Sequence, residues 1–200
     1  MIRFPICLLI ALPLSGFGQI GLFQWNDLQY GRFTTDSFLR LPVINQLIDP
    51  AKVDYPLLNA AIFYRTNQER VRHGIVEFHH SSALENAASG HSKDMFTHDF
   101  FSHTSPVPGK ESMGKRLAQE GVPIGVWAEN IYYMMNDGLT YWSAADRMVS
   151  GWMKSQGHRE NILERSVFYL GCGTWVTPDR EWPGSLNIRA TQNFSARATR

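Results

Sequence analysis

The feature that most constrains the fold of this 200-residue chain is a pair of strand-like segments near its C-terminus. Residues 166–176 are rich in aromatic and β-favouring side chains, and residues 185–196 alternate between apolar and polar over most of their length. The segment between them contains two prolines, a glycine and an aspartate, which are typical of turns. The two segments therefore predict an antiparallel β-hairpin. Within it, Gly171 and Gly173 are interpreted as strand packing rather than a nucleotide loop, and Cys172 as a buried small hydrophobic residue.

Helical patterns dominate the chain before this hairpin. In the clearest of them, Leu84, Ala88, His91 and Met95 recur on one face of a helix. Helices followed by an antiparallel hairpin predict an α+β protein, with helices packed on a sheet. The predicted helices cover about residues 56–74, 82–97 and 112–120, and a fourth begins near Ser143, where Asp146 completes a variant capping box. A short helix is expected at 42–48, one more helical turn at 161–165, and another strand at 129–135.

The N-terminus has the order of a secretory signal peptide. Arg3 supplies one positive charge, residues 4–14 form an apolar run, and small residues follow up to Gly18. The apolar run is shorter than the ~20 residues that a membrane-spanning helix needs, so no transmembrane segment is expected. Residues 1–18 are predicted to be a signal peptide, and residues 19–55 an N-terminal arm. The protein is expected to be secreted, to a periplasm or outside the cell.

Removal of this leader changes the charge and the cysteine count. The chain has 19 Lys and Arg against 18 Asp and Glu, and Arg3 is the leader's one charged residue, so the mature charge is 18 − 18 = 0. A neutral chain without a basic run argues against binding to nucleic acid. Cys7 lies in the leader, so Cys172 alone remains and no intramolecular disulfide is expected. The oligomeric state is left open.

The histidines differ in what their surroundings predict. His91 lies on an apolar helical stripe and is expected in the core, whereas His79 and His80 are expected to be solvated. His103 lies in an aromatic-flanked loop, and His158 is expected in a loop just past the fourth helix. Two loop histidines and a carboxylate could form a metal site if the fold brings them together.

A series of short motifs, in a fixed order, resembles a known family. Each motif is weak alone, but the seven occur in order over about residues 57–196, which includes most of the mature chain. The chain resembles the CAP superfamily, also called SCP, of cysteine-rich secretory, venom allergen and plant pathogenesis-related proteins, and its bacterial secreted branch in particular. The motifs are Asn67-x-x-Arg70; Leu84-x-x-x-Ala88-x-x-His91 with Met95; Phe101-Ser102-His103; Ala128-Glu129-Asn130; Trp152-x-x-Ser155-x-Gly157-His158-Arg159-x-Asn161-Ile162-Leu163; Gly171-x-Gly173; and Thr191-Gln192-x-Phe194.

The resemblance implies a fold and a site. The fold is a three-layer α-β-α sandwich with a central antiparallel sheet, formed here by a CAP/SCP domain over residues 56–200. The site is a cleft with two histidines and two acids, which by position are His103, His158 and Glu129, while Ser155 occupies the position of the second acid. Neutral histidines and one carboxylate could hold Zn²⁺ or another divalent cation, with Ser155 orienting a bound water. The alternative is that Glu129 accepts hydrogen bonds and fixes the loop.

Two functions from different classes remain open. The first is a non-enzymatic CAP domain that binds a lipid, a polymer or another protein in the cleft of His103, Glu129 and His158. The second is a metal-assisted extracellular peptidase or esterase, with Glu129 as general base and His103 and His158 as metal ligands. A catalytic pair of Ser155 and His158 is a further alternative. Aromatic side chains near these loops are expected either to line an apolar groove or to pack in the core: Phe100, Phe101, Trp127, Tyr132, Tyr133, Tyr141 and Trp142.

Overall fold

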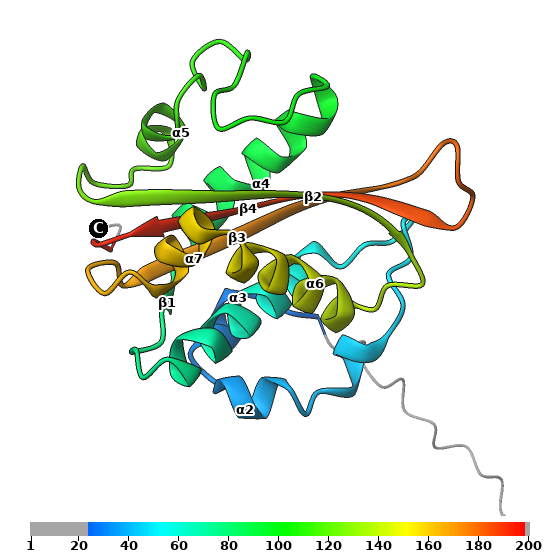
Figure 1. Cartoon of the computed structure of the whole chain (residues 1–200), viewed down its shortest axis with the longest axis horizontal. Coiled ribbons are helices and arrows are strands. Elements are labelled where there is room, and N and C mark those ends of the chain that lie inside the picture. Colours follow the sequence, from blue (N-terminus) through cyan, green and yellow to red (C-terminus); the bar gives the residue numbers. More distant parts are fainter. Residues whose placement is uncertain (1–23, 199–200) are drawn as a thin grey trace, which may run out of the picture.

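The computed structural model describes residues 24–198, and these form helical layers on both faces of one sheet (Figure 1). The signal peptide predicted at residues 1–18 and the start of the arm lie outside the described residues. Of the described helices, none is both long and apolar enough to cross a membrane. The elements are α1 Asp27–Tyr30, α2 Thr35–Phe38, the 3-10 helix η1 Pro42–Asn45, α3 Tyr55–Arg72, β1 His79–His80, α4 Ser82–Thr97, α5 Met113–Gln119, β2 Trp127–Asp137, α6 Tyr141–Lys154, α7 Gln156–Leu163, β3 Tyr169–Pro178 and β4 Ser185–Ser195.

The sheet has the strand order β1-β3-β4-β2. The predicted C-terminal hairpin is confirmed, since β3 and β4 pair antiparallel from Tyr169 opposite Ser195 to Pro178 opposite Leu186. The strand predicted at 129–135 is β2, which pairs antiparallel with β4 and leaves its other side as an edge of the sheet. The two-residue β1 runs parallel to β3, so the sheet is mixed rather than wholly antiparallel.

Figure 1 shows how the helices cover the sheet. α4 and α5 lie on one side, while α3, α6 and α7 lie on the other side together with the arm that carries α2. The α+β class is therefore confirmed, and the arrangement is the three layers implied by the resemblance. β2 lies at the open edge between the two helical layers, so loops from both layers can reach it.

Most helix positions follow the sequence pattern, and two differ. α4 has the predicted bounds, and α3 begins with Pro56 in its first turn, where the missing proline N–H is tolerated. The start predicted near Ser143 is wrong: Thr140 is the N-cap of α6, and the Ser143 hydroxyl accepts the reciprocal bond from the Thr140 N–H. The loop predicted around His158 is also wrong, because α7 begins at Gln156 and places His158 in its first turn.

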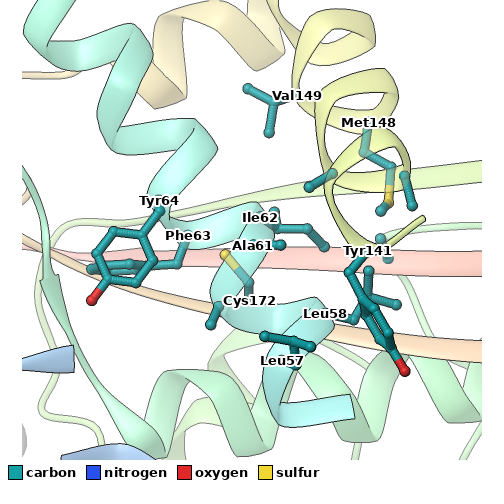
Figure 2. Close-up of a cluster of buried hydrophobic side chains, with 14 of the residues drawn as sticks. Leu57, Leu58, Ala61, Ile62, Phe63, Tyr64, Tyr141, Met148, Val149 and Cys172 are labelled. Carbon is teal, nitrogen blue, oxygen red and sulfur yellow. The ribbon is translucent and has the colours of Figure 1, made fainter. Parts of the chain in front are cut away.

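The core lies between α3, α6 and the sheet (Figure 2). Leu58, Ile62 and Met148 are fully buried there, and Cys172 of β3 is 1% exposed, as predicted for a small hydrophobic residue. The arm adds to the same core, since the side chains of Trp25 and Phe38 are buried in it. At ~25 cal/mol per Å² of apolar surface buried, the packing of such a core contributes most of the stability of a domain without disulfides.

The contact between α4 and the sheet depends on two glycines of β3. A Cβ atom added to Gly171 would overlap backbone atoms of Leu84 and Glu85, and one added to Gly173 would overlap those of Ala88 and Ser89. The prediction that these glycines serve strand packing is therefore confirmed. Their lack of a side chain lets the helix backbone lie directly on the strand, which sets the position of α4 and of the loop that follows it.

Candidate functional site

Three predicted residues come from three different elements around the open edge of the sheet. Glu129 belongs to β2, His103 to the loop between α4 and α5, and His158 to the first turn of α7. The neighbour of Glu129 on β2, Asn130, ties the α7 side to the strand, because its side-chain amide donates to the His158 carbonyl oxygen at 3.1 Å. The edge strand is thus where the two helical layers bring the histidines together.

Glu129 is the buried centre of this cluster, with 4% of its side chain exposed. Its Oε1 lies 2.9 Å from Nδ1 of His103 and its Oε2 2.7 Å from a guanidinium nitrogen of Arg116. Burial raises the pKa of Glu129, but the hydrogen bond from His103 and the charge of Arg116 outweigh burial and hold the pKa below its usual value. Glu129 is therefore an ionised carboxylate with both oxygens engaged.

The two site histidines have different environments. The side chain of His103 is 54% exposed, and because Nδ1 faces Glu129, Nε2 is the nitrogen left for a ligand. His158 is half-buried; its desolvation, together with the nearby charge of His103, lowers its pKa. The site therefore presents the imidazole of His103, oriented by Glu129, and the imidazole of His158, which favours its neutral form.

Arg116 is a member of the site that the sequence analysis missed. Its side chain is 2% exposed, and its guanidinium group donates to Glu129 and to the backbone carbonyls of His103 and Lys110. One residue therefore neutralises the carboxylate and holds the His103 loop in place. The sequence offered little signal, because an arginine in a short helix is usually solvated and only the tertiary packing of α5 buries this one.

His91 lies behind the site, fully buried as predicted. Its Nε2 lies 3.1 Å from the Ser102 carbonyl oxygen, and its Nδ1 has no hydrogen-bond partner among the described residues. Burial lowers the pKa of His91 to about 4, and the opposing charge of Glu129 only partly offsets this effect. His91 is therefore a neutral positioning residue that supports the loop carrying His103.

Replacing His91 with glutamine is expected to flatten the acid side of the stability profile. Between pH 6.5 and 4 the unfolded chain binds a proton that folded His91 does not, so the wild-type free energy of unfolding falls as the pH falls. For a folded pKa of about 4 this loss approaches about 3 kcal/mol at pH 4. Urea unfolding of both proteins at pH 7 and pH 4 measures it, with His98→Gln at an exposed position as control. Parallel profiles for wild type and His91→Gln would contradict the assignment.

The remaining predicted residues are placed as follows. Ser155 is half-buried between α6 and α7; its N–H donates to the Trp152 carbonyl at 3.1 Å and its carbonyl accepts the Arg159 N–H at 2.9 Å. Its catalytic pairing with His158 therefore stays a prediction. His79 is exposed as expected, but the solvated state predicted for His80 is wrong, since 8% of its side chain is exposed and its Nε2 lies 2.7 Å from Glu85.

The aromatic residues near the site divide between core and surface. Tyr141 is buried, and Tyr132 packs edge-on against Trp152. In contrast, Phe101 and Tyr133 are 49% and 42% exposed, with their ring centroids 6.2 Å apart. The surface beside His103 thus has an exposed apolar part, which continues along β2 away from Glu129.

The donor set does not match the zinc site considered for His103, His158 and Glu129. Catalytic zinc sites use three protein ligands and one open position. Glu129 already has both oxygens engaged, and residues 24–198 contain no group of three or more His, Cys, Asp or Glu side chains arranged to hold a metal ion. Metal binding at this site therefore stays a prediction.

Comparison with known proteins agrees with the fold and the motif order. The family model CAP, cysteine-rich secretory protein family, matches residues 63–184, from α3 to the turn before β4. The uncharacterized membrane protein YlbC of Bacillus subtilis is 34% identical over 132 residues, which are 66% of this chain and 32% of that protein. The uncharacterized protein YkwD of the same species is 30% identical over 108 residues, 54% of this chain and 38% of that protein. The chain thus spans about a third of the length of each of these relatives.

Solved structures show the same fold. An extracellular protein of Bacillus anthracis that contains an SCP domain has a TM-score of 0.59 and 29% identity, covering 76% of this chain and 45% of that one. An outer surface protein of Borrelia burgdorferi has a TM-score of 0.55 at 14% identity, covering 76% of this chain and 98% of that one, and this likeness concerns the fold alone. Because the family model matches more than half of the chain, this protein belongs to the CAP, or cysteine-rich secretory protein, family.

Proposed function

We propose that this protein is an exported CAP domain that binds an extracellular ligand, without catalysis, at the surface formed by His103, Glu129 and His158. The leader-like residues 1–18 support export, as does the description of the Bacillus anthracis relative as an extracellular protein. The observation that carries the binding role is the state of Glu129. Its two oxygens are engaged by His103 and Arg116, so it orients a histidine and is not a free general base.

The exposure of the site favours a large ligand over an enclosed small molecule. His103 is half exposed, and the apolar side chains of Phe101 and Tyr133 continue from it along the edge strand. A polymer or an extended protein segment would contact both parts, with His103 and His158 supplying polar contacts and the aromatic rings apolar area. Of the three ligand classes predicted from the sequence, this choice keeps polymer and protein and leaves out lipid.

Binding to arrays of extracellular polysaccharides and of extended peptides tests this function. We expect ligands that bind wild type to lose at least about tenfold in affinity with His103→Ala, a loss typical of an interface anchor. His98→Ala, at the exposed end of α4, is the matched control and should bind like wild type. If no array member binds, or if His98→Ala loses as much as His103→Ala, the proposed site is wrong.

A second candidate, an extracellular peptidase or esterase, is favoured by one specific contact. A carboxylate on Nδ1 of a histidine leaves Nε2 able to accept a proton, as in the general bases of hydrolases. The residue that would act is then His103, with Glu129 as its orienting partner. Assays on a peptide and ester panel, with and without added Zn²⁺, distinguish binding without catalysis from hydrolysis. Turnover that His103→Ala abolishes would support the hydrolase in place of the binding function.

Metal content gives an independent measurement on the same residues. Because two imidazoles without a free carboxylate make an incomplete donor set, we expect purified wild type to retain less than one zinc ion per chain after dialysis. Elemental analysis of wild type, His103→Ala and His98→Ala checks this. Stoichiometric zinc that only His103→Ala removes would instead support the metal site predicted from the sequence.

A further inference from the structure

A cavity lies away from the His103 site, between the N-terminal arm and α3. Its volume is about 530 Å³, within the range of small-molecule sites. One wall comes from the arm, with Tyr30, Phe33 and Thr35, and the opposite wall from α3 and the segment before β1. The arm wall lies outside residues 63–184, the part matched to the family, so this cavity is a feature that the family match does not supply.

Five of the residues that line this cavity, here called the arm cavity, are Phe or Tyr, and several of these rings pack against neighbouring rings. Tyr30 stacks on His80 at 3.6 Å between ring centroids with planes 3° apart, and Tyr64 stacks on Phe38 at 4.3 Å. The Tyr64 hydroxyl lies 3.3 Å from the carbonyl oxygens of both Tyr30 and Phe33, which fixes the two walls relative to one another. A ligand that enters would therefore meet aromatic surfaces that need not reorganise.

Two carboxylates line the arm cavity. Asp27 and Glu77 line it, and Glu77 accepts a hydrogen bond from the Thr35 hydroxyl. None of the described residues that line it is a lysine or an arginine. His80 also lines it, but its Nε2 is directed to Glu85 at 2.7 Å. The described lining of the arm cavity thus supplies aromatic rings and two carboxylates but no lysine or arginine; the Arg70 guanidinium lies 3.7 Å over the Phe78 ring and donates to the Val76 carbonyl.

We propose that the arm cavity binds a small organic cation, such as a quaternary or primary amine. Aromatic rings attract ammonium groups through the negative potential of their faces, and carboxylates add Coulomb attraction. An anion would be repelled by the two carboxylates, and a neutral ligand of the same shape would lose both contributions. This site is separate from the His103 surface and does not depend on its function.

Choline and its uncharged isostere 3,3-dimethylbutan-1-ol are the probes that test the charge preference. Titration of the full chain, followed by calorimetry and by tryptophan fluorescence, should show choline binding at least about tenfold tighter than the isostere. Glu77→Gln should weaken choline binding by several-fold and leave binding of the isostere unchanged. Glu120→Gln, at an exposed residue that follows α5, should bind choline like wild type. His103→Ala should also bind choline like wild type, because the two sites are separate.

Folding of the variants is checked by thermal unfolding, so that a lost cavity is not mistaken for a lost contact. Asp27→Asn is the second variant, since it removes the other carboxylate from an exposed position. The proposal is overturned if choline and its isostere bind equally, or if neither binds at concentrations on the order of 10 mM. It is also overturned if folded Glu77→Gln and Asp27→Asn both bind choline like wild type.

Discussion

Replacing Gly173 with alanine is expected to prevent stable folding of this domain. The added Cβ would overlap the backbone of Ala88 and Ser89 in α4, and backbone atoms in a helix cannot move aside as a flexible side chain can. Separating α4 from β3 would open the contact that holds one whole layer on the sheet. We expect a loss of more than about 4 kcal/mol, out of the roughly 5–15 kcal/mol by which ordinary domains are stable.

The measurement is urea unfolding followed by circular dichroism, with Gly90→Ala as the matched control. Gly90 lies within α4 itself, and a Cβ there would meet no atom within 4 Å. Because alanine favours helix over glycine, Gly90→Ala should be unchanged or more stable by up to about 1 kcal/mol. A folded Gly173→Ala protein with near wild-type stability would show that α4 does not lie against β3 as described.

Replacing Arg116 with methionine is expected to destabilise the site and the fold together. The change leaves Glu129 as a buried charge without its cation, and removes the donors to the carbonyls of His103 and Lys110. Breaking one side of a buried ion pair costs about 3–5 kcal/mol in comparable proteins. We expect the free energy of unfolding to fall by that amount and the His103 loop to become more susceptible to proteolysis.

The neighbouring lysine provides the control for this prediction. Lys115 forms an ion pair with Glu111 at 2.9 Å in which both side chains are largely exposed, so Lys115→Met should cost no more than about 1 kcal/mol. The double variant Arg116→Met with Glu129→Gln should lose less than the sum of its two single changes, since it leaves no buried charge unpaired. Additive losses, or equal effects of Arg116→Met and Lys115→Met, would contradict the role assigned to Arg116.

Local patterns predicted much of the secondary structure. The stripe that includes Leu84, Ala88 and Met95 gave the bounds of α4, and the alternation at residues 185–196 located β4. The errors came where two local signals compete. Thr140 and Ser143 are both good N-caps, and the structure uses Thr140. The segment from Ser155 to His158 was interpreted as a loop because Gly157 favours loops and α6 ends just before it, at Lys154, but this segment opens α7.

Sequence motifs also named three residues of the site, but not how they are connected. His103, Glu129 and His158 were identified by motif order, and the structure places them around the edge strand β2. Arg116 donates to the second oxygen of Glu129, but no local sequence pattern predicts this role, because the burial of Arg116 depends on how α5 packs against α4. The same is true of His80, which the chain buries only by placing Tyr30 of the arm across its ring.

By itself, the sequence determined the order of helices and strands, the burial of Cys172 and the family, because these follow from periodicity, composition and short motifs. The tertiary structure alone decided the charge state of Glu129, the exposure of His103 and the arm cavity. Each of these depends on side chains far apart in the chain: Arg116 is 13 residues from Glu129, and Thr35 is 42 residues from Glu77. Burial and electrostatic pairing are properties of three-dimensional neighbours, and these neighbours exist only once the layers have packed.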